Sequence, residues 1–342
     1  MGASDTVTIV GAGLMGHGIA QVFAAHGHPV RLFDTNDTIL MEAPQRIRAN
    51  LVQLAAHGIG DETAIDTIVA RVSLVHNLAE ACASTNVVIE AVSENMDLKQ
   101  RIFAELDHLC PPDAILCSNT SVMSITEIAS KSQGRERILG THWWNPPYLV
   151  PLVEIVRTVD TAQRCIDAVY DLLVRVGKKP VRVHKDVPGF VGNRLQHALW
   201  REAFSIIDDG IAEAATVDEV VRSGFGLRLP VLGPVENADL VGLDLTLAIH
   251  DYILPHLSRD TQPSATLRAK VAEGKLGFKT GAGFLPWSEP EIAATRERLS
   301  NHLMKVLVEQ QRNSGNEPGL QNAGTEQTGQ SGNVSQRRSD ES

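Results

Sequence analysis

The stretch GTHWWNPPYLVPLVEIV (residues 140–156) contains a histidine and a glutamate whose spacing would suit acid–base chemistry. His142 closes one apolar run and Glu154 lies inside the next, with Tyr148 in the middle of the proline-rich corner between them. If the two runs fold back on each other, the carboxylate can fix the histidine tautomer and leave the second ring nitrogen to accept a proton from a substrate hydroxyl. A buried pair with a purely structural role fits this spacing equally well.

Other polar side chains could hold a substrate oxygen near such a pair. Ser118, Asn119 and Ser121 follow an apolar run in CSNTS, and Asn193 lies in PGFVGNRL, where a helical pattern begins. Each is more typical of a helix cap or a turn than of catalysis when taken alone. Together they supply the donors that an oxyanion or alkoxide needs.

A glycine-rich turn, GAGLMG, predicts a dinucleotide site near the N-terminus. Gly11, Gly13 and Gly16 follow a predicted strand and open a predicted helix, which would allow a tight turn, a close approach of backbone to pyrophosphate and close helix packing. Asp34 ends the next predicted strand, where its carboxylate could bind an adenosine ribose and would repel a 2′-phosphate, so the pattern favours NAD over NADP. The alternatives are a glycine turn that binds no ligand and a site that binds FAD.

The elements that must position these residues follow from hydrophobic patterning. Short β-branched runs alternate with helical periodicity in the first half of the chain, which is typical of βαβ units around a parallel sheet. Strands are predicted at 7–10, 30–33, 72–75, 87–92, 114–118, 138–142, 151–156 and 180–185. The predicted fold class is α/β, a Rossmann-type doubly wound and mostly parallel sheet followed by an all-helical C-terminal domain. His142 would then lie at the carboxyl end of its strand, the edge where such sheets bind ligands.

The strand signals stop after DVPG (186–189), which sets the expected domain boundary. We predict a cofactor-binding domain at 1–187, a helical substrate and dimerisation domain at 188–312, and a disordered tail at 313–342. The tail is predicted to be disordered because it has almost no large apolar residues to offset the entropy of ordering.

Charge and composition exclude several classes of protein. The chain has 342 residues, with 31 Lys and Arg against 41 Asp and Glu, and no long basic stretch, so a nucleic-acid partner is not expected. The four cysteines have no C-x-x-C spacing, so we expect neither a disulfide nor a zinc site. No run has the roughly 20 apolar residues of a membrane helix, and the first strand is too short for a signal peptide, so a cytoplasmic location without membrane contact is expected.

Taken in order, GAGLMGHGIA, SNTS, THWWNPP…PLVEIV, PGFVGNRL and GKLGFKTGAGF resemble the L-3-hydroxyacyl-CoA dehydrogenase family from about Thr6 to Trp287. The resemblance implies that His142 and Glu154 are the catalytic pair and that Ser121 and Asn193 hold the substrate oxygen. It also implies a homodimer built through the helical domain. The NAD contacts that it implies are Gly11, Gly13, Leu14, Met15, Gly16, Asp34, Glu94, Lys99, Ser121, Asn145 and Lys279.

The chain departs from many CoA-acting relatives, which have a phenylalanine pair after the histidine and a lysine near the end of the helix following the second strand. Here Trp143, Trp144 and His57 stand at these places, which leaves Asn50, Arg46 and Arg48 as candidates for CoA contacts.

The expected reaction is NAD-dependent oxidation of a 3-hydroxy group to a 3-keto group, with an L-3-hydroxyacyl-CoA as the first candidate substrate. The form NPPYLVPLVE also resembles the lambda-crystallin branch, so the second candidate is a small non-CoA hydroxy acid resembling L-gulonate, carnitine or a pyridine carboxylate. The third is a non-enzymatic, crystallin-like scaffold.

Overall fold

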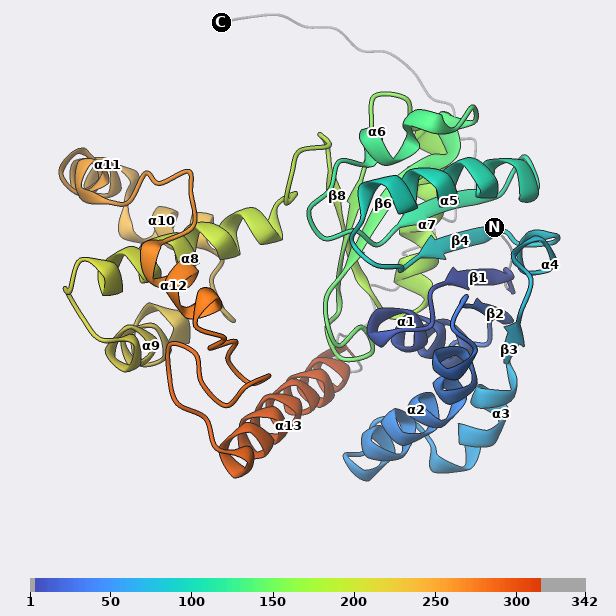
Figure 1. Cartoon of the computed structure of the whole chain (residues 1–342), viewed down its shortest axis with the longest axis horizontal. Helices are drawn as coiled ribbons and strands as arrows, with labels where there is room; N and C mark the ends of the chain where they lie inside the picture. The colour runs from blue at the N-terminus through green and yellow to red at the C-terminus, as the bar shows by residue number, and fades with distance from the viewer. Residues whose placement is uncertain (1–3, 315–342) are drawn as a thin grey trace, which may run out of the picture.

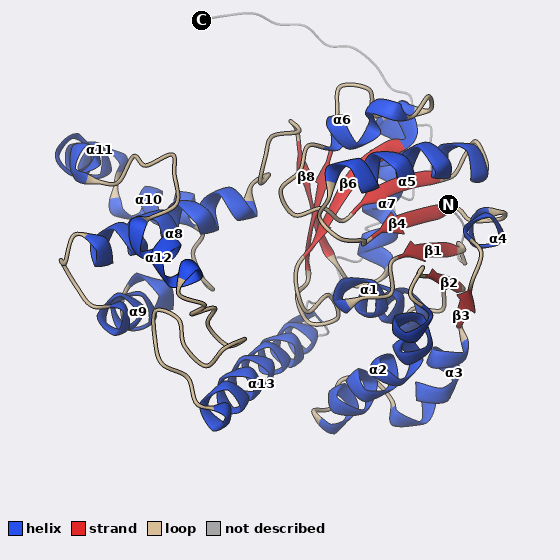
Figure 2. Cartoon of the chain, in the orientation of Figure 1, coloured by secondary structure: helices blue, strands red, loops and turns tan. Residues whose placement is uncertain are grey.

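The computed structural model describes residues 4–314, which form a large sheet flanked by helices and a separate group of helices beside it (Figure 1, Figure 2). The sheet has eight strands in the order β3-β2-β1-β4-β5-β6-β7-β8. All neighbouring pairs are parallel except β6 and β7, which are antiparallel. The strands are β1 (Val7–Val10), β2 (Val30–Phe33), β3 (Val72–Val75), β4 (Val87–Glu90), β5 (Ile115–Ser118), β6 (Ile138–Trp143), β7 (Leu152–Val156) and β8 (Lys179–Val183). This topology confirms the predicted fold class.

The central strands are buried along their whole length, which explains why they read as continuous β-branched runs rather than as alternating patterns. Every residue of β1, β4, β5 and β6 is buried, whereas the edge strand β8 has both buried and exposed positions. The strand order reverses between β1 and β4, and such a switch point opens a crevice at the carboxyl ends of the strands.

Helices cover both faces of the sheet. One core cluster packs α1 (Leu14–Ala25), α2 (Asp37–Ala56), α3 (Ile65–Ala70) and α7 (Gln163–Arg175) on one face. The other packs α4 (Leu78–Cys82), α5 (Met96–Leu109) and α6 (Ile125–Ile128) on the opposite face. Asparagine caps start several of these helices: Asn36 accepts a hydrogen bond from the Ile39 amide in α2, and Asn95 accepts one from the Leu98 amide in α5. The short 3₁₀ turns are η1 (Glu62–Ala64), η2 (Ala129–Lys131), η3 (Arg135–Arg137), η4 (Phe225–Leu227) and η5 (Leu254–His256).

The second group of helices lies apart from the sheet and begins with α8 (Gly192–Asp208), followed by α9 (Ala214–Ser223), α10 (Pro234–Val241), α11 (Leu243–Ile253) and α12 (Ala265–Ala272). None of these five helices contains a buried residue in the described chain, and many of their large apolar side chains are exposed. They lie within residues 188–312, the range predicted for the helical domain.

The last helix, α13 (Glu289–Ser314), departs from that expected domain, because it returns to the sheet-containing part of the chain (Figure 1). Met304 of α13 is buried in a cluster with Leu54 and Ile59 beside the end of α2 and with Leu149. The expected tail falls mostly outside the described residues, while its first two positions belong to α13.

Cys82, Cys110, Cys117 and Cys165 are all buried and free. Within residues 4–314, no helix combines the length and apolar character needed to cross a bilayer.

Candidate active site

Strands β6 and β7 place the predicted pair face to face. His142 and Glu154 are direct partners in the antiparallel register, and Glu154 Oε2 lies 2.7 Å from His142 Nδ1. Both side chains are almost completely buried, at 4% and 1% exposure. The corner between the strands therefore forms the hairpin that the symmetric spacing required.

The second carboxylate oxygen of Glu154 ties the pair to the start of α8. The backbone amides of Val191 and Gly192 donate to Oε1 at 2.9 and 3.0 Å. Gly189 and Phe190, just before them, both have left-handed backbones, with φ of 77° and 50°, so this junction turns sharply toward the glutamate. Glu154 thus joins the histidine to the point where the helical region begins.

These contacts fix the charge state of Glu154. Burial opposes ionisation, but the hydrogen bonds from His142 and from the amides of Gly192 and Val191 outweigh it, so the pKa of Glu154 lies below its usual value. An ionised carboxylate requires a proton on Nδ1, so in the neutral imidazole the lone pair lies on His142 Nε2.

The free ring nitrogen of His142 remains open. No described residue hydrogen-bonds Nε2, and this atom is not sealed from solvent. By contrast, Trp143 Nε1 and Trp144 Nε1 are buried without a hydrogen-bond partner among the described residues. The rings of Trp144 and Phe190 lie 5.1 and 5.8 Å from the imidazole, centroid to centroid. An oriented histidine with one open, basic nitrogen can accept a proton from a hydroxyl.

The structure also brings together Ser121 and Asn193, the two residues expected to hold a substrate oxygen. Asn193 Nδ2, on α8, donates to the Ser121 carbonyl at 2.7 Å, and both residues are only half-buried. Asn119 and Ser118 have different roles: Asn119 accepts from the Trp143 amide at 2.9 Å, and Ser118 is fully buried. These two residues support the turn and are not offered to a ligand.

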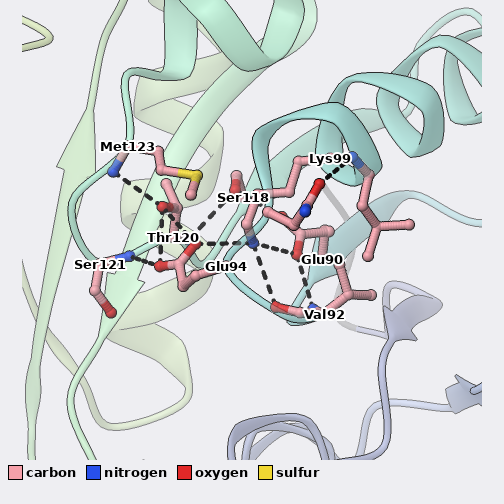
Figure 3. Close-up of polar contacts among 10 residues, drawn as sticks. Glu90, Val92, Glu94, Lys99, Ser118, Thr120, Ser121 and Met123 are labelled. Atoms are coloured by element: carbon pink, nitrogen blue, oxygen red, sulfur yellow. Dashed lines mark hydrogen bonds and ion pairs between the residues drawn. The ribbon is translucent and has the colours of Figure 1, made fainter. Parts of the chain in front are cut away.

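A partly buried polar network underlies the Ser121 turn (Figure 3). Glu90, at the end of β4, accepts from Lys99 Nζ, Ser118 Oγ and the Val92 amide at 2.7, 2.7 and 2.8 Å. Glu94 accepts from the Ser121 amide at 2.6 Å and from Thr120 Oγ1 at 3.0 Å. The turn that carries Ser121 is therefore fixed by two glutamates.

The position of Lys99 differs from the one predicted, which was a direct contact with the cofactor. Lys99 is 1% exposed and forms ion pairs with Glu90 at 2.7 Å and with Glu94 at 3.4 Å. From the sequence, a lysine in the first turns of an amphipathic helix is expected to lie on the surface. In the structure the Lys99 ammonium is instead enclosed beneath Glu94. In this geometry Lys99 can act on a ligand only through Glu94.

The glycine loop has the geometry that a dinucleotide requires. A Cβ on Gly16 would lie 1.7 Å from the Gly11 carbonyl oxygen, and Gly11 has φ of 105° with Ala91 O at 2.6 Å from its own would-be Cβ. No atom lies within 4 Å of a Cβ on Gly13, so the space beside it is open. Leu14 and Met15 continue the loop into α1, and Leu14 is 66% exposed. The loop thus presents bare backbone at a helix N-terminus.

A cavity of about 660 Å³ continues from this loop along the switch point. Asp34 lines it and uses one oxygen to accept from the Ala12 amide at 2.7 Å and the other to accept from the Asn36 amide at 2.8 Å. Arg101 and Glu105, which sequence reasoning missed, line the same cavity from α5. Arg101 and Glu105 are four residues apart, so they share one face of the helix that follows the predicted strand 87–92. This spacing could have identified them from the sequence.

Two expected cofactor residues are not brought to this cavity. Asn145 is exposed in the corner after β6, and Lys279 is exposed in the segment between α12 and α13. Neither side chain has a hydrogen bond or ion pair with another residue in the described part of the chain. Both remain predictions.

Known proteins match both halves of the chain. The model of the 3-hydroxyacyl-CoA dehydrogenase NAD binding domain matches residues 6–187, and that of the C-terminal domain of the same enzymes matches residues 189–287. The chain belongs to the 3-hydroxyacyl-CoA dehydrogenase family. As a member of this family it is an NAD-dependent oxidoreductase that oxidises a 3-hydroxy group. NAD thus fits the open glycine loop and the cavity beside Asp34.

Individual members of the 3-hydroxyacyl-CoA dehydrogenase family align over most of the chain. A probable 3-hydroxybutyryl-CoA dehydrogenase of Bacillus subtilis (strain 168) is 37% identical over 284 residues, covering 83% of this chain and 97% of that protein. The 3-hydroxyadipyl-CoA dehydrogenase of Escherichia coli (strain K12) is 34% identical over 89% of this chain, which spans 64% of that protein's length. The solved structure of 5-formyl-3-hydroxy-2-methylpyridine 4-carboxylic acid 5-dehydrogenase has a TM-score of 0.81 at 29% identity, covering 89% of this chain and 97% of the other.

Proposed function

We propose that His142 Nε2 accepts the proton of the substrate 3-hydroxyl and that Glu154 is the orienting carboxylate. The 2.7 Å contact between His142 Nδ1 and Glu154 carries this proposal, because it sets the tautomer that leaves Nε2 basic. As the proton arrives, the adjacent carboxylate stabilises the imidazolium. Glu154 also fixes the start of α8, so the base and the oxygen-holding helix keep one geometry.

Ser121 and Asn193 are proposed to hold the substrate oxygen opposite His142. Asn193 donates one amide hydrogen to the Ser121 carbonyl, which orients the amide and leaves its second hydrogen available. The Ser121 hydroxyl is on the same turn, held by Glu94 through the Ser121 amide. Two donors that converge on one oxygen would stabilise the charge that develops when the hydroxyl loses its proton.

The proposed NAD contacts are the glycine loop (Gly11, Gly13, Leu14, Met15 and Gly16), Asp34, Glu94, Ser121, Asn145 and Lys279. NAD, when bound, supplies the hydride acceptor for the oxidation. Asp34 would bind the adenosine ribose at the end of β2, in the cavity beside the loop. Lys99 is proposed as a positioning residue, because its ammonium holds Glu94 from beneath.

An L-3-hydroxyacyl-CoA is proposed as the substrate, because the relatives from Bacillus subtilis and Escherichia coli bear names that specify CoA esters. The second candidate is a small hydroxy acid without CoA. It is favoured by the TM-score of 0.81 to the pyridine-carboxylate dehydrogenase. It is also favoured by the residues considered for CoA contacts: Arg46 pairs with Glu42, Arg48 pairs with Asp66, and Asn50 bonds Gln21.

A homodimer through the helical region is also proposed. Helices α8 to α12 have no buried residue in the single chain, although exposed apolar side chains recur along α8, α10 and α11. Helices stabilised in water need such faces covered. A second copy of the chain would cover them. A cytoplasmic location remains a proposal.

The test is an NADH absorbance assay with acetoacetyl-CoA, L-gulonate and carnitine as alternative substrates. The proposal expects turnover of one class, and His142→Gln should reduce that turnover about 10²- to 10⁴-fold while NADH affinity stays unchanged. His57→Gln is the matched control, since the His57 side chain is exposed and bonds only the Gln53 carbonyl in the described structure. Near wild-type activity of His142→Gln would remove the proposed mechanism.

A further inference from the structure

A second cavity, of about 370 Å³, lies away from the site described above. It is enclosed by α1, α2, the segment around α3, the corner after β6, the turn between α7 and β8, and Leu307 of α13. It shares no lining residue with the cavity beside Asp34, and it does not include His142, Glu154, Ser121 or Asn193. The established reaction therefore leaves it without a role.

The walls of this cavity are mainly apolar, and its size is within the range of small-molecule sites. Side chains of three helices and of the corner contribute, namely Val22, Ala25, Leu51, Leu54, Ile65, Ile68, Leu149 and Pro151. Among these apolar groups is one buried cation, Lys178. Apolar walls around a few polar groups are typical of a pocket that binds an amphiphilic small molecule.

Lys178 is a buried ammonium without a counter-charge. Its Nζ donates to the carbonyls of Pro147 and Val150, the latter at 3.1 Å, and lies 5.4 Å from the centre of the Trp143 ring. Among residues 4–314, no carboxylate forms an ion pair with it, and two carbonyls use only two of its three hydrogens. Buried charges are normally paired, so this ammonium has one hydrogen without an acceptor, and only the Trp143 ring and the two carbonyls offset its charge in the described structure.

We propose that this cavity is a second binding site for a small organic anion with an apolar tail. The anionic group pairs with Lys178 Nζ through its free hydrogen, and the tail lies against α1, α2 and α3. Charge complementarity selects an anion, and the apolar walls select a hydrocarbon tail over a polar one. No covalent step is involved.

The charge on Lys178 also predicts how binding depends on pH. Burial lowers the pKa of Lys178 to about 8, so the ammonium is present at neutral pH and is lost as the pH rises through that value. The other titratable side chains lining the cavity are His26 on α1, Asp61 before α3 and Tyr148 in the corner. Burial raises the pKa of Tyr148, so this phenol stays neutral across the same range.

The site is attached to the corner that follows His142. Lys178 holds the corner through the carbonyls of Pro147 and Val150, and Asn145 lies at the start of the same corner. A ligand on Lys178 therefore contacts the segment that connects the two strands of the catalytic pair.

Octanoate is a suitable probe, and titration calorimetry on the full-length protein at pH 7, with NADH present, measures its binding directly. We expect wild type to bind octanoate and Lys178→Met to bind it about tenfold or more weakly, because a charge-assisted hydrogen bond is lost. Lys179→Met is the matched control, since Lys179 is exposed and should leave affinity unchanged.

A second variant keeps the test independent of any damage to the corner. Ala25→Phe fills the cavity from the end of α1, where Ala25 is exposed, and should also abolish octanoate binding without disturbing the fold. His142→Gln should bind octanoate as wild type does, which separates this cavity from the catalytic site. Equal binding by wild type, Lys178→Met and Ala25→Phe would overturn the proposal, as would no binding by wild type at millimolar octanoate.

Discussion

Glu154 determines the electrostatics of the His142–Glu154 pair through three hydrogen bonds. It is 1% exposed, yet donors from His142, Val191 and Gly192 hold its pKa below the usual value despite burial. The folded protein therefore keeps this carboxylate ionised to lower pH than the unfolded chain does. By linkage, the stability that results is fully present above the ordinary glutamate pKa, near 4.3, and is lost as the pH falls through the folded-state pKa.

Glu154→Gln should reveal that linkage in urea unfolding. Because charge-assisted hydrogen bonds become neutral ones, we expect the variant to lose about 1–3 kcal/mol of unfolding free energy at pH 7. Wild type becomes protonated at Glu154 in acid, so the difference between the two proteins should shrink as the pH falls below about 4. A difference of equal size at pH 7 and in acid would show that Glu154 is not the titrating group.

At this scale the sequence predicts contacts that depend on local spacing. His142 and Glu154 flank their corner symmetrically, and a hairpin must then pair them, as it does. Lys99 could not be placed in the same way, since its burial depends on how α5 packs against the end of β4, where its ammonium pairs with Glu90 and Glu94. Asn145 and Lys279 remain untested for a similar reason: their contacts with a ligand depend on how distant segments meet.

Strand β4 and helix α5 are joined by the buried ion pair between Glu90 and Lys99. Both side chains are essentially inaccessible, at 0% and 1% exposure, so neither charge can be solvated if the other is removed. Removing one partner of a buried pair is far more destabilising than removing both. The pair therefore couples the stability of this βα unit to the placement of Glu94 beside it.

Lys99→Met should leave Glu90 as an unpaired buried carboxylate and lower the unfolding free energy by about 3–5 kcal/mol. The double variant Lys99→Met/Glu90→Gln should recover most of that loss in denaturant titrations, because no buried charge remains. Its KM for NAD should still exceed that of wild type, because Glu94 has lost the ammonium at 3.4 Å. If the double variant is as unstable as the single one, or if its KM is normal, Lys99 has no positioning role.

Strands could be predicted from the sequence where burial on both faces of the sheet determines their amino-acid composition. All eight strands lie within two residues of the predicted ranges, since buried parallel strands must be continuous β-branched runs. The docking of α13 was not predictable in this way. Its helical periodicity is clear in the sequence, but the choice of partner for Met304 depends on the apolar surface that Leu54, Ile59 and Leu149 create only after folding.

At the scale of the whole molecule, the helical region is the part whose apolar side chains are left exposed in the described chain. Its five helices contain no buried residue in the described chain, while the sheet-containing part has extensive buried cores on both faces. Leu243, Leu245, Leu247, Ile249 and Ile253 of α11 are between 42% and 63% exposed. Leaving so many apolar side chains in water forgoes the main stabilising contribution to folding.

The proposed dimer can be tested by placing a charge on that surface. Leu247 on α11 is 62% exposed in one chain, so Leu247→Asp would bury a carboxylate if a second copy packs there. We expect sedimentation velocity to give wild type twice the mass of one chain, and the variant to become monomeric or to lose helicity by circular dichroism. Val159→Asp is the control, because Val159 is 92% exposed on the sheet-containing part and should leave the dimer intact. A monomeric wild type, or a Leu247→Asp protein with unchanged mass and unchanged thermal midpoint, would show that this face is not the interface.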